Sequence, residues 1–410
     1  MTQPAPLDLI EPVAGAAAAA SPSRARGALF KRLADVVCLP ASRVNAFERS
    51  MTADLLVDML REASPAERAR VARRLSGLTE IPHVLVRLLL RDEIAVAQPL
   101  LEECASLADP DLLDCIRHAE MDHRRLIALR RGVGDVVSEA LVESGEAPVV
   151  DALLKNDTAR LSSTAVELLV AASRDLPRVI PMLLRRGELR PRHAYVMFWW
   201  ADADARRLIL QRFAVSREVL QDAVGDVFSM AADESWSDPL ARKALQFIER
   251  RQRNRAAIDK SPYDSLDDAI GASARGMTRE KAEEISYLSG IKPMTGAKIF
   301  TDPGGEPLAI LCKATGLPRA AVRQLWTALR RPETDETGAM SPALERVLIT
   351  YDMIAVDRAQ TVLRYWNWSL SSAMSPALIR AIREGDDGAV DEYSAPQRAA
   401  MLALGRDMAR

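Results

Sequence analysis

The feature that most constrains this chain is a short pattern that recurs five times between about residue 81 and residue 225. Each copy consists of an apolar helix end, a short loop and a second apolar stretch. The aligned positions in the five helix ends are 28, 25, 30 and 27 residues apart: Leu100, Ala128, Leu153, Leu183 and Leu210. A single pair of short helices cannot bury its own apolar face, so such pairs stack on their neighbours. The pattern predicts an α-solenoid over 81–230, with pairs shorter than the roughly 40 residues of ordinary HEAT repeats.

The composition of the whole chain also favours an all-α protein. The 410 residues include only 19 Gly and 5% aromatic residues, whereas sheets are rich in aromatic and β-branched side chains. The net charge of −2 excludes a global field that would attract nucleic acid or anionic lipid. The longest apolar run, Ala194–Ala201, is too short to cross a bilayer, so we expect a cytoplasmic protein with no membrane partner. Four cysteines without a CxxC spacing predict reduced thiols.

Changes in periodicity predict how the chain is divided. Residues 1–27 form a tract of Pro, Ala and Ser that we expect to be a disordered arm, followed by a small helical bundle over 28–80. Within this bundle, helices are expected to start at Ser50 and at Ser64, where Pro65 and Glu67 complete a capping pattern. Four further segments follow the solenoid: a basic connecting helix over 231–261, a C-terminal helical domain over 262–331, a polar linker over 332–341 and C-terminal helices over 342–410.

One long amphipathic helix is predicted over Pro342–Ser369. Its apolar residues recur every three or four positions: Leu348, Tyr351, Ile354, Ala355, Ala359, Val362, Leu363 and Trp366. This stripe can pack on the rest of the chain or across a two-fold axis. The sequence leaves both arrangements open, including a homodimer through residues 342–369.

Four stretches resemble a known family. His123–Arg131, Val137–Gly145, Leu308–Leu317 and Arg358–Trp366 look like an uncharacterised alphaproteobacterial family of HEAT-like helical proteins, the domain of unknown function 2336. The resemblance covers about Ile81–Trp368 and implies a helical-repeat fold in a bacterial cytosol. Since no activity is established for that family, the resemblance implies no catalytic residue.

A metal site is the first chemistry to weigh. Potential ligands crowd the nine residues from 115 to 123: Cys115, His118, Glu120, Asp122 and His123. Cys115 and His118 would share a helix face, but His123 falls where a new helix should begin and no second Cys or His pair lies nearby. We therefore expect Cys115 to pack inward, and we expect no metal.

Catalytic motifs are also absent from the sequence. It contains no GxSxG elbow, Walker loop, GxGxxG turn or HExxH helix. A hydrolytic triad would have to use one of only four histidines without a supporting signature. The sequence therefore predicts a protein that is not an enzyme and that has no cofactor.

A cluster of basic and aromatic residues within 185–212 is the best candidate binding site. We expect six of them to line the groove of the solenoid: Arg185, Arg186, Arg190, Trp199, Trp200 and Arg207. Such a groove suits an acidic or amphipathic protein partner, so the primary hypothesis is a non-enzymatic scaffold or adaptor. The alternative interpretation is that Met197, Phe198 and one tryptophan simply fill the core of this repeat.

The same cluster supports an alternative function. Arginines could hold a phosphate backbone and indoles could stack a base, as in HEAT-like alkylpurine DNA glycosylases, with Asp202 or Asp204 assisting. The acidic residues dilute the positive charge, and analogy of fold is a weak argument for function. Nucleic-acid or nucleotide binding is therefore the second hypothesis.

Overall fold

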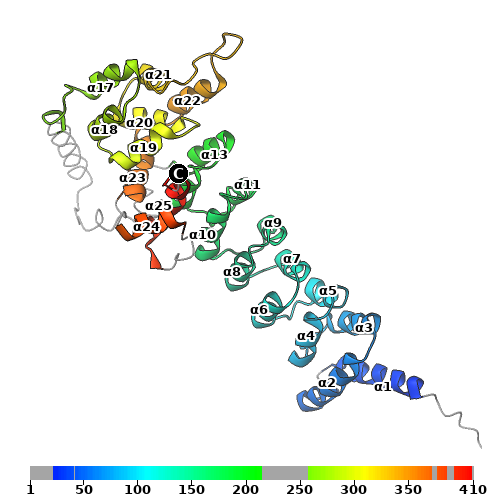
Figure 1. The fold of residues 1–410 in the computed structure, drawn as a ribbon. Helices are drawn as coiled ribbons and strands as arrows, with labels where there is room; N and C mark the ends of the chain where they lie inside the picture. Colours follow the sequence, from blue (N-terminus) through cyan, green and yellow to red (C-terminus); the bar gives the residue numbers. More distant parts are fainter. Residues whose placement is uncertain (1–21, 41, 215–256, 372–375, 386–391, 409–410) are drawn as a thin grey trace, which may run out of the picture. The chain divides into compact units, whose positions relative to one another are not determined.

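The computed structural model describes residues 22–40, 42–214, 257–371, 376–385 and 392–408 (Figure 1). These residues form two compact units, the N-terminal unit Met1–Arg160 and the C-terminal unit Leu161–Arg410. The regular structure of the described residues is helical, apart from one isolated β-bridge between Thr334 and Met340. The predicted all-α fold is confirmed. None of the described helices combines the length and apolarity that a bilayer span requires.

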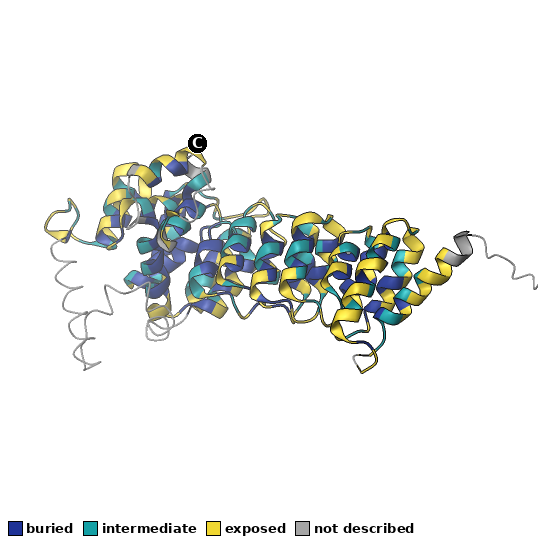
Figure 2. Cartoon of the chain, turned by 90° about the horizontal axis from the view of Figure 1, so that it is seen from below, coloured by how far each residue is buried: buried dark blue, intermediate teal, exposed yellow. Residues whose placement is uncertain are grey.

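The N-terminal unit is built from short helices packed in two layers. In chain order the helices are α1 (Pro22–Val37), α2 (Ala46–Arg61), α3 (Pro65–Leu75), α4 (His83–Leu90), α5 (Ile94–Glu103), α6 (Asp109–His118), α7 (Met121–Leu129), α8 (Asp135–Glu143) and α9 (Ala147–Lys155). Beyond α1, each helix packs on the helix two places further along the chain, so that α2, α4, α6 and α8 form one layer and α3, α5, α7 and α9 the other. Buried residues lie between the layers and exposed residues on the outer faces (Figure 2).

Local capping chemistry decides where the first helices begin. The capping box predicted at Ser64 is present, because the backbone N–H of Ser64 donates to Glu67 Oε2 at 2.9 Å. The predicted start at Ser50 is wrong: α2 begins at Ala46, since the Asn45 side chain accepts a hydrogen bond from the Glu48 N–H. The end predicted for the disordered arm is also wrong, because 22–27 belong to α1. Residues 1–21 lie outside the described part of the chain.

Side chains at the repeated helix ends bond to the preceding repeat. Arg130 donates to the carbonyl oxygens of Leu100, Leu101 and Cys104, at the end of α5. Asn156 Nδ2 donates in the same way to the carbonyls of Ala128 and Arg130, at 2.8 and 2.6 Å. The last carbonyls of a helix have no partner within it, so these bonds satisfy groups that would otherwise need water. They join each repeat to the one before it.

The C-terminal unit begins with short helices, and its later helices pack around one central helix. Its described helices are α10 (Ser163–Ala172), α11 (Val179–Leu183), α12 (Pro191–Met197), α13 (Ala203–Phe213), α17 (Leu266–Ala272), the 3₁₀ turn η1 (Ser273–Arg275), α18 (Arg279–Leu288), α19 (Pro293–Thr301), α20 (Glu306–Thr315), α21 (Arg319–Ala328), α22 (Pro342–Met353), α23 (Val356–Ser371), α24 (Pro376–Glu384) and α25 (Ala395–Met408). The almost completely buried helix α20 is the centre, and α19, α21, α22 and α23 pack around it.

The repeat-joining bond recurs in this unit. Arg212 donates to the carbonyls of Leu184 and Arg186, 28 and 26 residues earlier. The spacing matches that of Asn156 in the N-terminal unit. A continuous solenoid over 81–230 stays a prediction, because the two units divide at Arg160 and 215–256 lie outside the described residues. Most of the predicted basic connecting helix falls in that undescribed range.

The single helix predicted over Pro342–Ser369 is wrong. The chain breaks into α22 and α23 at Ile354, whose backbone is extended at φ −85° and ψ 133°. The break lets both helices pack on α20, which one straight helix could not do. Most of the predicted stripe is then buried within the chain, while Ala355 at the break is exposed. The predicted linker before α22 is a turn closed by the Thr334–Met340 bridge.

Candidate functional site

Of the two tryptophans predicted to line a groove, Trp199 lies in the core and Trp200 is only partly exposed. Trp199 is buried and its ring centroid is 4.6 Å from that of Trp366 in α23. Trp200 is half-buried, and its Nε1 donates to Ser173 Oγ at 3.0 Å. The Trp366 ring also packs against that of Phe198, with the centroids 5.1 Å apart and the rings tilted. The prediction of an exposed indole is therefore wrong for Trp199, which packs against α23 from far along the chain, and the alternative that one tryptophan fills the core describes it.

The four predicted arginines do not share one surface. Arg186 is buried and pairs with Glu188 at 2.8 Å, whereas Arg185, Arg190 and Arg207 are exposed. Only Arg207 lines the groove described below. Of the carboxylates considered for base excision, Asp202 caps α13 by accepting a bond from the Ala205 N–H.

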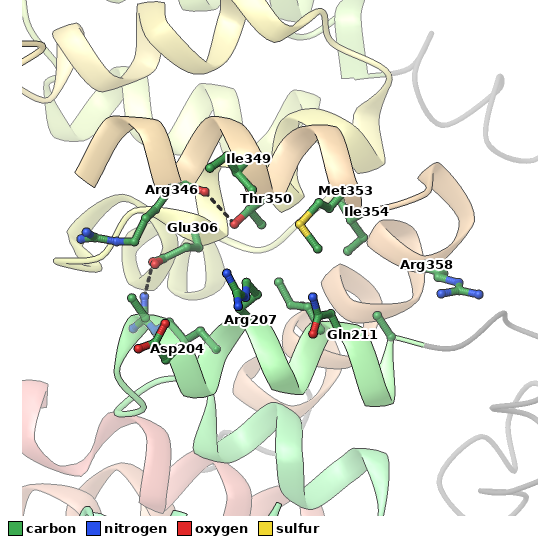
Figure 3. A pocket seen from close by; sticks show the side chains of 14 residues that line it. Asp204, Arg207, Gln211, Glu306, Arg346, Ile349, Thr350, Met353, Ile354 and Arg358 are labelled. Atoms are coloured by element: carbon green, nitrogen blue, oxygen red, sulfur yellow. Dashed lines mark hydrogen bonds and ion pairs between the residues drawn. The ribbon is translucent and has the colours of Figure 1, made fainter. Parts of the chain in front are cut away.

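A groove of the C-terminal unit lies between α13 and α22 (Figure 3). Its volume is about 230 Å³, and residues of α20 and of the first turn of α23 also line it. Leu210 and Ile354 form apolar walls, and the exposed side chains of Ile349 and Met353 form the rim on α22. The volume is below the roughly 300–1,000 Å³ of typical small-molecule pockets. It suits a few side chains of a partner better than a whole ligand.

A buried ion-pair network fixes one wall of this groove. Arg206 Nη1 donates to Asp302 Oδ2 and to Glu306 Oε2, both at 2.7 Å, and Nη2 donates to Asp302 Oδ1 at 2.6 Å. Burial alone would lower the pKa of Arg206, but the hydrogen bond to Asp302 and the two carboxylate charges raise it above its usual range. The guanidinium therefore stays charged and holds α13 against α20. The carboxylates of Asp302 and Glu306 neutralise its charge, so this charge does not act on a ligand in the groove.

The other arginines of the groove keep their charge available. Arg207 lies between the two helices, while Arg346 and Arg358 lie toward opposite ends (Figure 3). Within the described part of the chain, these three side chains form no ion pair. Asp204 is the remaining exposed carboxylate of the lining. Because Glu306 is paired with Arg206, the groove presents a net positive edge beside an apolar surface. The sequence cluster included Arg207 but missed Arg346 and Arg358, which only the fold brings beside it.

A second, broader cavity in the N-terminal unit has no such charge bias. It lies between α2, α3 and α4 and has a volume of about 850 Å³. Arg68 on its wall pairs with Asp92 at 2.5 Å, and Arg91 pairs with Asp114. These two ion pairs neutralise the charges of Arg68 and Arg91 and join neighbouring helices of the unit.

The residues considered as metal ligands do not converge. Cys115 is buried and its Sγ donates to the Leu90 carbonyl, while burial raises the pKa of its thiol to about 12. His118 Nδ1 is 2.9 Å from the Asp114 carbonyl, and His123 Nε2 is 2.9 Å from the Asp92 carbonyl. Among the described residues, no group of three or more His, Cys, Asp or Glu side chains could hold a metal ion. No disulfide joins the four cysteines.

One titratable cluster, with the buried His193 at its centre, joins α10, α12 and α25. His193 Nε2 accepts a hydrogen bond from Arg192 Nε at 3.1 Å and lies 3.9 Å from Glu167 Oε1. Arg398 Nη2 donates to the other oxygen of Glu167 at 2.8 Å. Burial lowers the pKa of His193, and the nearby Arg192 and Arg190 lower it further, against the opposing effect of Glu167. The imidazole is enclosed among these groups and is held neutral at pH 7.

Comparison with known proteins identifies a family but no activity. The family model described as an uncharacterised protein conserved in bacteria (DUF2336) matches residues 96–364, well over half of the chain. No curated protein and no solved structure matches this chain.

Proposed function

We propose that this chain, a member of the DUF2336 family, is a non-enzymatic cytoplasmic adaptor that binds a helix of a partner protein in the groove between α13 and α22. The observation that carries the proposal is the pairing of an apolar groove with three arginines that have no ion pair among the described residues. Recognition of an amphipathic helix in an apolar groove is a recurrent mode of protein binding.

The proposed partner segment has an apolar face flanked by acidic side chains. Ile349 and Met353 are one helical turn apart on α22 and offer apolar contacts to such a face. Helix α22 has 12 residues and is about 18 Å long, so it can lie along three or four turns of a partner helix. Arg346, Arg207 and Arg358, arranged along this length, would meet carboxylates at successive turns.

Binding of a synthetic probe tests this proposal. The probe is a helical peptide of about 15–20 residues with Leu on one face and Glu on both flanks, long enough to hold helical structure. We expect binding by fluorescence anisotropy, and a loss of affinity of about tenfold or more in the Arg207→Glu variant, because a central charge is reversed. Arg185→Glu is the matched control, because it reverses an exposed charge that does not line the groove.

Equal weakening by both variants, or no weakening by Arg207→Glu, would refute the groove as the binding site. The nucleic-acid hypothesis gives a different result with a DNA duplex as probe. Duplex affinity that falls steeply with salt and is lost in Arg207→Glu would assign the groove to phosphate binding instead.

A further inference from the structure

The outward face of α2 in the N-terminal unit carries a continuous row of exposed apolar side chains. Phe47, Met51 and Leu55 follow one another at intervals of four residues and are 73%, 53% and 56% exposed. Residues four apart lie on one face of a helix, so the row is about 12 Å long. Isolated exposed apolar residues are ordinary, but a contiguous row marks an interaction surface.

The row faces away from the helices that pack on α2. Ala53, Leu56 and Leu60 are completely buried and occupy the opposite side of α2, toward α1 and α4. Helix α2 is also the first member of its layer in the N-terminal unit. Helix α1 packs on α2 as well, so the row is the face of α2 that neither α1 nor α4 covers.

The charges beside the row decide which kind of partner fits. Glu48 and Asp54 lie on either side of it, and Asp58 lies at its C-terminal end, by the angular spacing of helical residues. Arg61 pairs with Asp58 at 3.3 Å, but both side chains are largely exposed, so the pairing is weak. Arg49 does not offset the acidic charges, because its guanidinium donates to the Leu39 carbonyl.

We propose that this α2 face is a second docking surface, which takes an amphipathic helix with Leu-type anchors and Lys or Arg flanks from a partner protein. An antiparallel α2 pair from two copies would bring the acidic flanks together, and like charges at a short distance oppose that pairing. The acidic flanks also oppose contact with anionic lipid. A basic helix is the occupant that satisfies both the apolar row and its charges.

The test uses the full chain carrying Arg207→Glu, so that the α13–α22 groove does not contribute. The probe is a helical peptide of about 15–20 residues with Leu on one face and Lys on both flanks. We expect it to bind, and Phe47→Ser with Leu55→Ser to weaken binding about tenfold or more, because two anchors are lost. The matched control is Leu129→Ser with Val136→Ser, which removes two similarly exposed apolar residues from α7 and α8. All four side chains are exposed, so folding is expected to survive, as circular dichroism can verify.

A second variant tests the charges separately. Asp54→Asn with Asp58→Asn should weaken binding at low salt and flatten its salt dependence while the apolar row is intact. Equal effects of the row and control variants would overturn the proposal, and so would stronger binding of the Glu-flanked peptide than of the Lys-flanked one.

Sedimentation tests whether a second copy occupies the face instead. A dimer that dissociates in the Phe47→Ser with Leu55→Ser variant would assign the face to a second copy. Neither result bears on the adaptor proposal, which depends on a different surface.

Discussion

The N-terminal and C-terminal units use the same short helices but differ in the sequence distance over which they are held together. In the N-terminal unit, Arg68 reaches Asp92 and Arg124 reaches Glu146, 24 and 22 residues along the chain. In the C-terminal unit, Arg206 reaches Glu306 across 100 residues, and Arg398 reaches Glu167 across 231 residues. The first unit is a sequence of similar neighbour contacts, whereas the second depends on a few contacts between distant segments.

This difference has consequences for stability. Where each helix pair contacts only its neighbours, stability is close to a sum of local terms, and damage at one pair stays local. A unit closed by distant contacts loses several helix interfaces when one such contact is broken. The candidate groove belongs to the second kind, because Arg206 fixes α13 against α20 on one side of it.

The largest effect is expected from breaking the buried network of the C-terminal unit. Arg206→Ala leaves the carboxylates of Asp302 and Glu306 buried without their cation and should lower the free energy of unfolding by about 3–5 kcal/mol. Arg68→Ala removes a less buried ion pair of the N-terminal unit and should cost about 1–3 kcal/mol. Urea denaturation measures both costs, and hydrogen exchange should show loss of protection across α13 and α20 in the first variant. A smaller cost for Arg206→Ala would contradict the contrast between the units.

Two glycines, one in each unit, distinguish the stability cost of overpacking from the cost of an unfavourable backbone conformation. A Cβ on Gly296 in the C-terminal unit would lie 1.8 Å from Ser286 Oγ, so Gly296→Ala should cost about 1–3 kcal/mol by overpacking α18 against α19. Gly145 in the N-terminal unit has φ +67° and open space around it, so Gly145→Ala should cost about 1–2 kcal/mol through the backbone alone.

Asparagine substitutions check these two causes. Asn tolerates the left-handed region, so Gly145→Asn should be milder than Gly145→Ala, whereas Gly296→Asn should be worse than Gly296→Ala. Thermal unfolding of the four variants measures the order. If the Asn variant were the more stable, or the less stable, of the two at both positions, the contrast between overpacking at Gly296 and backbone strain at Gly145 would be refuted.

The smallest effect is expected from mild acid, and only in the C-terminal unit. The pKa of His193 is lower in the folded chain than its unfolded value of about 6.5, so between these values the unfolded chain binds a proton that the folded chain does not. Stability should therefore be complete above about pH 6.5 and fall as the pH drops toward the folded pKa.

The N-terminal unit should behave differently over the same range. Arg91 lowers the pKa of Asp114 and Arg124 lowers that of Glu146, so the stability from these carboxylates is present above about pH 4 and is lost only below it. Hydrogen exchange at pH 7 and pH 5, corrected for intrinsic rates, should show weakening of α10, α12 and α25 alone. His193→Gln should remove this dependence, and persistence of the dependence in that variant would exclude the histidine as its cause.

The sequence predicted those features whose causes lie within one or two helices. Ser64, Pro65 and Glu67 were sufficient to place the start of α3, because the donors and acceptors of a capping box are four consecutive residues. At Asn45 the same chemistry was present, and the predicted start at Ser50 overlooked it. The candidate site was harder to predict from the sequence. Arg207 belonged to a visible cluster, but nothing in that cluster pointed to Arg346 or Arg358.

By itself, the sequence determined that this chain is helical and where the repeated helix ends fall, because helix propensity, apolar period and caps act over a few residues. The tertiary structure decided that Trp199 lies in the core, that Arg206 is a structural cation and that the chain turns at Ile354. Each of these depends on which distant segment arrives alongside, so its energy is gained only once the C-terminal unit has closed around α20.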